Sequence, residues 1–140
     1  MGRRINEKFI SEYIELDREC SDKFGVPYGG VTEYINRLNT ARFAPGREEV
    51  MPRLVRYRNI RNRLAHEIAS IRRTGEVTKE DIAWLKKFLR AVRKRRDPIS
   101  IYFLKARRYA RRRAISRVVT AVASFLLVLI TVIAIIFLVK

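Results

Sequence analysis

Residues 118–139 decide the architecture of this chain, and they read VVTAVASFLLVLITVIAIIFLV. These 22 residues include no charge, no glycine and no proline. At about 1.5 Å of rise per residue they form a helix about 33 Å long, which matches the hydrocarbon core of a bilayer. The alternative is a buried core helix, but the roughly 120 remaining residues are too polar to cover a helix that is apolar on every face. The sequence therefore predicts one transmembrane helix.

Seven basic residues, here called the basic collar, lie just before this segment, and only Lys140 follows it. They are Lys105, Arg107, Arg108, Arg111, Arg112, Arg113 and Arg117. This asymmetry predicts a cytoplasmic N-terminal side. The collar also favours anionic lipid, at about 1 kcal/mol per basic residue near the surface. Because MGRRINEKF at the start has no apolar stretch, we expect a tail-anchored, single-pass protein of the cell membrane and no signal peptide.

The net charge of +17 is unevenly distributed along the chain. Residues 1–50 carry 8 basic and 9 acidic side chains, whereas residues 51–140 carry 23 and 5. Some of the excess lies too far upstream to set membrane topology and indicates either a polyanionic partner or a solvated helix face. These residues are Arg53, Arg56, Arg58, Arg61, Arg63, Arg72 and Arg73.

Four helices are predicted before Pro98. The first, from about Asn6 to Phe24, carries an apolar stripe, and the second extends from Thr32 to Asn39. The stripe of the first helix comprises Phe9, Ile10, Tyr13, Ile14, Leu16, Cys20 and Phe24. In the second helix Tyr34, Ile35 and Leu38 are expected to point inward.

The third helix is predicted from Glu48 to about Arg73, with one irregular member in its apolar stripe. The stripe comprises Val50, Leu54, Tyr57, Arg61, Leu64, Ile68 and Ile71. Arg61 is a guanidinium at a position where an apolar side chain is expected.

The fourth helix opens with a pattern similar to a capping box, Thr78 to Asp81, and ends before Asp97. Its predicted inward residues are Ile82, Leu85, Phe88, Leu89 and Val92. No helix breaker follows Pro98, so the collar and the apolar segment are expected to form one helix. The fold class is all-α: a small helical bundle over residues 1–97, a basic juxtamembrane helix over 98–117 and a transmembrane helix over 118–139.

Few residues suit catalysis. Cys20 and His66 are the only cysteine and histidine, so no disulfide within the chain and no cysteine-based metal cluster is expected, and no metal or cofactor is predicted. At about 100° per residue, Asn62 and His66 share a face of the third helix, and Arg61 lies about 140° from His66. An imidazole, a guanidinium and an amide suffice for a metal-free phosphoryl reaction.

The stretch RNIRNRLAHE, residues 58–67, resembles the HEPN domain ribonucleases, which are helical bundles. Their signature is Arg, often with Asn directly after it, then a gap of four to six residues and His. Arg61, Asn62 and His66 match it. The resemblance implies a homodimer that cleaves RNA without metal, with His66 as acid or base and Arg61 stabilising the phosphorane. Many HEPN proteins are toxins or phage-defence effectors, which implies a partner antitoxin.

These residues are compatible with two main functions and with a third, less favoured one, a small structural membrane component that has no ligand. The favoured one is a tail-anchored endoribonuclease with Arg61, Asn62 and His66 in catalysis and Arg58 and Arg63 binding RNA. The second is a non-catalytic membrane adaptor whose basic surface binds RNA or anionic lipid. If these residues have no catalytic role, His66 and Asn62 are ordinary surface residues, and Arg61 extends from the helix edge to solvent. Tyr57 is either a base-stacking residue or, more in keeping with its position, a core residue.

Overall fold

The computed structural model describes residues 2–66 and 77–138, and every regular element in that part of the chain is a helix. The helices are α1 (Gly2–Phe24), α2 (Gly30–Thr40), α3 (Arg47–His66), α4 (Lys79–Arg93) and α5 (Pro98–Leu138). The chain divides into two compact units, Met1–Tyr102 and Phe103–Lys140. The all-α fold class is confirmed.

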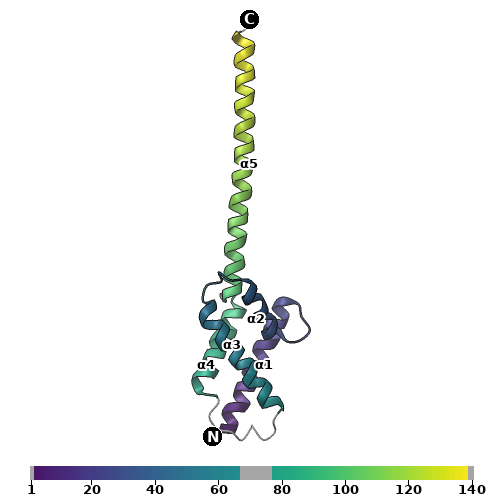
Figure 1. Cartoon of the computed structure of the whole chain (residues 1–140), viewed down its shortest axis with the longest axis vertical. Coiled ribbons are helices and arrows are strands. Elements are labelled where there is room, and N and C mark those ends of the chain that lie inside the picture. The colour runs from purple at the N-terminus through teal and green to yellow at the C-terminus, as the bar shows by residue number, and fades with distance from the viewer. Residues whose placement is uncertain (1, 67–76, 139–140) are drawn as a thin grey trace. The chain divides into compact units, whose positions relative to one another are not determined.

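The first unit is built around α1, which packs against α2, α3 and α4, while α2 also packs against α3 (Figure 1). Its core is aromatic and aliphatic, with Phe9, Leu16, Tyr34 and Leu54 fully buried. The inward residues predicted for α2 and α4 are all buried. In α1, Ile14 is exposed and does not belong to the core.

Contacts between α1 and α2 set where α2 begins. Gly25, which follows the last residue of α1, and Gly29, which precedes α2, both adopt positive φ angles. A Cβ atom at Gly30 would overlap the backbone of Asp17, so the two helices approach closely there. The Val31 N–H donates to Asp17 Oδ1 at 2.8 Å, so α1 caps α2 from outside. Because this cap comes from another helix, α2 begins at Gly30, two residues before the predicted Thr32.

The capping box of α4 is confirmed. The Thr78 side chain accepts from the Asp81 N–H at 3.2 Å, and the Asp81 carboxylate accepts from the Thr78 N–H at 2.9 Å. Asp81 also accepts from Tyr57 Oη at 2.9 Å and from Arg56 at 3.0 Å. Tyr57 is 1% exposed, so its core interpretation is confirmed. Burial alone would raise the pKa of Asp81, but these hydrogen bonds and the Arg56 charge outweigh burial and lower it.

A buried carboxylate fixes the start of α5 within the first unit. Asp97 is 0% exposed and caps the helix, accepting from the Ser100 N–H at 3.2 Å. Lys23 Nζ lies 2.7 Å from each oxygen of Asp97, and Tyr34 Oη donates to it at 2.8 Å. Burial alone would raise the pKa of Asp97, but hydrogen bonds from Lys23, Ser100 and Tyr34 hold the pKa below its ordinary value.

The second unit is the remainder of α5. The helix continues without a break from Pro98 to Leu138, as the sequence predicted (Figure 1). It is the one helix in the described residues that is long and apolar enough to cross a membrane. Its apolar side chains from Val118 to Ile136 are exposed. Exposed apolar surface of this extent is unfavourable in water and suits a lipid environment.

Candidate functional site

Within its described residues, the third helix departs from its predicted stripe at one position. Ile60 is 2% exposed and joins Leu64 in the core, whereas Arg61 is exposed. The prediction of Arg61 as a stripe member was therefore wrong. The physical reason is that Arg61 borders a cavity at the surface of the first unit, where its guanidinium reaches water. The prediction that α3 continues to Arg73 falls outside the described residues.

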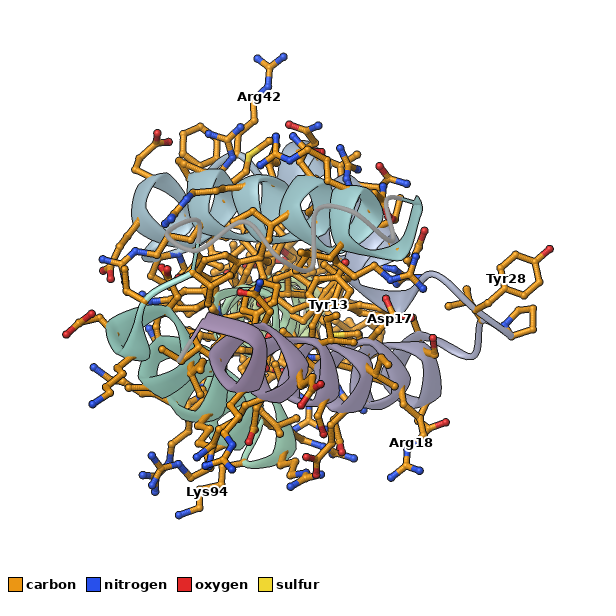
Figure 2. All side chains as sticks on the ribbon, turned by 90° about the horizontal axis from the view of Figure 1, so that it is seen from below. Tyr13, Asp17, Arg18, Tyr28, Arg42 and Lys94 are labelled. Carbon is orange, nitrogen blue, oxygen red and sulfur yellow. The ribbon has the colours of Figure 1, made fainter. Side chains whose placement is uncertain are left out.

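This cavity, here called the arginine cavity, lies between α1, the start of α2 and α3, and has a volume of about 350 Å³. Its lining comprises Tyr13, Ile14, Asp17, Tyr28, Gly29, Thr32, Arg58, Arg61 and Asn62. Figure 2 shows Tyr13 and Asp17 on the side of α1 that faces α3, and Tyr28 pointing outward from the loop that precedes α2. The cavity therefore carries one carboxylate on α1 and two guanidiniums on α3.

The predicted catalytic residues are only partly brought together. Arg61 and Asn62 both line the cavity, and Arg61 Nη1 donates to Asn62 Oδ1 at 3.4 Å. His66 is the last described residue of α3, and its side chain lies outside the described part of the chain. A catalytic role for the three residues stays a prediction.

The two predicted RNA-binding arginines lie in different places. Arg58 lines the arginine cavity, whereas Arg63 lines a separate hollow along α3 together with Met51 and Val55. At about 100° per residue, these two arginines are about 140° apart around the helix axis. The structure therefore does not join Arg63 to the cavity.

Several other domain arginines are held in ion pairs within the protein. On α3, Arg53 pairs with Glu49 at 3.9 Å and Arg56 with Asp81 at 3.0 Å. Arg93 of α4 bridges to α1 at 2.7 Å from Glu15. These contacts account for part of the basic excess without a polyanionic partner. Arg72 and Arg73 lie outside the described residues.

Sequence reasoning placed Tyr13 in the core stripe and gave no role to Asp17. Tyr13 is 4% exposed, and burial raises the pKa of its phenol, with the Asp17 charge adding to the rise and Arg61 and Arg58 opposing it. The phenol is therefore neutral, and its O–H both donates and accepts. The i, i+4 spacing of Tyr13 and Asp17 is the signal that places them on one face of α1.

The basic collar surrounds α5. At about 100° per residue, its side chains fall on three ridges spaced about 120° apart around the axis. One ridge holds Lys105, Arg108 and Arg112, the second Arg107 and Arg111, and the third Arg113 and Arg117. All seven side chains are exposed. In the described part of the chain, no group of three acidic, histidine or cysteine side chains is placed to hold a metal ion.

The fold and these two cationic sites define a small helical domain joined to a helix that can span a membrane. Residues 7–118 match a family of unknown function, DUF6548, and the chain belongs to this family. The match includes the arginine cavity and the collar. No curated protein and no solved structure matches the chain.

This family assignment corrects the resemblance to HEPN ribonucleases, because the matched family is an uncharacterised one and no HEPN match is found. The resemblance to the HEPN signature rested on three residues, Arg61, Asn62 and His66, in an arginine-rich helix. The homodimer and antitoxin expectations rested on the resemblance and stay untested predictions.

Proposed function

We propose that this chain is a single-pass membrane protein whose basic collar binds anionic lipid headgroups on the cytoplasmic face and holds the helical domain beside the bilayer as a binding module. The observation that carries the proposal is the continuity of α5, in which Arg117 directly precedes the apolar segment that begins at Val118. Cationic side chains on the same helix as an apolar span are held at headgroup depth when that span enters a bilayer.

The three-ridge arrangement supports an upright helix. A helix that lies flat in the interface needs one apolar and one charged face. The collar has cations on every side, so a flat orientation would push some of them into hydrocarbon, at about 2.5 to 3.5 kcal/mol or more each. An upright helix instead directs all three ridges into the headgroup layer. The collar spans about 18 Å along the axis, so its outer part also extends into the aqueous phase.

Lipid is favoured over RNA as the partner of the collar. The collar and the apolar span belong to one helix, so insertion of the span places the collar next to lipid headgroups. RNA instead has to bind from solution, where salt screens its attraction to the collar. Several arginines that would have guided RNA onto the domain are paired with acidic side chains, Arg56 with Asp81 among them. The ribonuclease prediction is tested alongside, as the alternative outcome.

The experiment is native mass spectrometry of the full chain in neutral detergent, with phosphatidylglycerol or phosphatidylcholine added. Wild type should retain phosphatidylglycerol preferentially. Replacing Arg111, Arg112 and Arg113 by glutamine should weaken retention by about a hundredfold, from about 1 kcal/mol per residue. The matched triple lysine variant should retain most of the binding, because the attraction is mainly electrostatic. Equal retention of both lipids would refute the proposal.

RNA is the control ligand in the same experiment. The full chain is incubated with total RNA and a chelator, and the products are analysed for 2′,3′-cyclic phosphate ends. Cleavage that Arg61→Ala abolishes would replace the adaptor proposal with the ribonuclease one. Topology is measured with a reporter at the N-terminus, which should be protected from protease in right-side-out vesicles and cleaved in inverted ones.

A further inference from the structure

The arginine cavity carries two features that the fold does not require. Arg58 and Arg61 lie one helical turn apart on α3, and neither forms an ion pair with a carboxylate in the described part of the chain. Five other arginines of the domain, Arg37, Arg47, Arg53, Arg56 and Arg93, each lie 2.7 to 3.9 Å from a carboxylate. Arg18 and Arg42 have no ion pair with a described residue either, but they point into solvent and do not line the cavity (Figure 2). Arg58 and Arg61 differ in that both line one cavity, which they share with a single carboxylate, Asp17, and this excess of positive charge on a concave surface favours an anionic ligand.

Tyr13 is the second feature, and it is independent of the first. Its side chain is 4% exposed, it lines the cavity, and its hydroxyl forms no hydrogen bond with any described residue. The hydroxyl is not fully buried, because among the described residues only the Asn6 side-chain amide is a fully buried polar group without a partner, so the Tyr13 hydroxyl borders the cavity and can form a hydrogen bond there. A ligand in the cavity is therefore within reach of this hydroxyl.

Asp17 restricts the kind of anion that fits. One of its oxygens accepts from the Val31 N–H, and the carboxylate lies in the same lining as the two arginines. A ligand that is anionic throughout would be repelled by this carboxylate. The complementary ligand has an anionic end for Arg58 and Arg61 and a neutral or cationic hydrogen-bond donor at its other end for Asp17 and Tyr13.

We infer that the arginine cavity binds a small phosphate monoester whose other end carries hydroxyl or amino donors. The guanidiniums of Arg58 and Arg61 match the phosphate oxygens, and Asn62 adds an amide next to them. Ribonucleoside monophosphates and phosphoethanolamine both have this chemistry, and the experiment distinguishes them. The inference does not depend on lipid binding by the collar.

Isothermal titration calorimetry tests this with the full chain in nanodiscs of pure phosphatidylcholine, so that no anionic lipid competes. The probes are the four ribonucleoside 5′-monophosphates, O-phosphoethanolamine and inorganic phosphate. At least one ester should bind more tightly than inorganic phosphate. If only nucleotides bind, the ligand is a nucleotide; if only phosphoethanolamine binds, it is an amino phosphate.

Variants locate the binding. Arg58→Met and Arg61→Met should each weaken ester binding by about tenfold to a hundredfold, as expected for a charge-assisted hydrogen bond. Arg53→Met is the matched control, since Arg53 lies on the same helix outside the cavity and is paired with Glu49, and it should leave the affinity unchanged. Tyr13→Phe should weaken ester binding and leave phosphate binding unaffected.

Three results would overturn the inference: no probe binds up to millimolar concentration, inorganic phosphate binds as tightly as every ester, or both cavity variants bind like wild type. Thermal unfolding of each variant serves as the folding check. Because Arg58 and Arg61 form no ion pair with a described residue, neither substitution should lower the melting temperature appreciably.

Discussion

Replacing Asp97 by asparagine should destabilise the helical domain by about 3 kcal/mol. Breaking a buried ion pair by removing one partner costs about 3 to 5 kcal/mol. Asp97 is 0% exposed and the Lys23 side chain is 18% exposed, so some water reaches the ammonium and the lower end applies. Asparagine keeps an acceptor for the Ser100 N–H, so the change removes the charge and retains the helix cap.

The measurement is urea unfolding of the full chain in neutral detergent, followed by the fluorescence of Trp84. This is the only tryptophan, and its ring stacks on Phe88 with centroids 5.0 Å apart, so its emission reports on the domain and not on the apolar part of α5. In thermal unfolding the same loss corresponds to roughly 12 °C for a domain of this size.

The matched control is Asp22→Asn, which makes the same chemical change at an exposed position of α1 and should stay within about 0.5 kcal/mol of wild type. In Lys23→Met with Asp97→Asn, the loss should be smaller than the sum of the two single losses, because neither charge is then buried alone. If Asp97→Asn unfolds at the same urea concentration as Asp22→Asn, the ion pair does not stabilise the domain and the reasoning is wrong.

Three further predictions use the same fluorescence assay. Ile60→Ala should cost about 2 to 4 kcal/mol and Arg61→Ala less than about 0.5, because Ile60 and not Arg61 is buried; equal losses would contradict the assignment of the α3 core. Gly30→Ala should destabilise by more than about 1 kcal/mol, since its Cβ overlaps the backbone of α1, and an unchanged midpoint would argue against this close helix contact. Stability should fall as the pH drops below about 4, because Asp81 and Asp97 have lowered pKa values in the folded state. Their contribution is complete above the unfolded pKa and is lost as the pH falls through the folded pKa. A pH-independent midpoint between pH 5 and pH 2 would be inconsistent with this.

Local sequence signals predicted most of the helices. The capping box at Thr78, the apolar stripe of α4 and the uninterrupted helix after Pro98 are properties of neighbouring residues, and all three are confirmed. Helix boundaries were less accurate where another helix decides them. The start of α2 depends on a hydrogen bond that the Asp17 carboxylate of α1 accepts from the Val31 N–H. The two residues are 14 positions apart in the sequence, so no local pattern contains this contact.

The candidate site was predicted only in part. Arg58, Arg61 and Asn62 were singled out from the sequence, and the structure gathers them at one cavity. Tyr13 and Asp17 were missed as cavity residues because they belong to a different helix. Arg63 was included because it is close in sequence, but helical geometry directs it elsewhere. Asp97 was interpreted only as a helix end, although Asp followed by Pro is also a signal for a helix start.

The amino-acid sequence by itself determined the all-helical class and the long apolar helix with its basic collar, because charge and helical periodicity are properties of consecutive residues. The tertiary structure alone decided which arginines are paired, which tyrosine borders the cavity and which carboxylate is buried. Those properties depend on distances between α1, α2, α3 and the start of α5, and residues as far apart as Lys23 and Asp97 meet only when these elements pack. Arg56 and Arg61, five residues apart on one helix, thus differ because Asp81 lies beside one of them and a cavity beside the other.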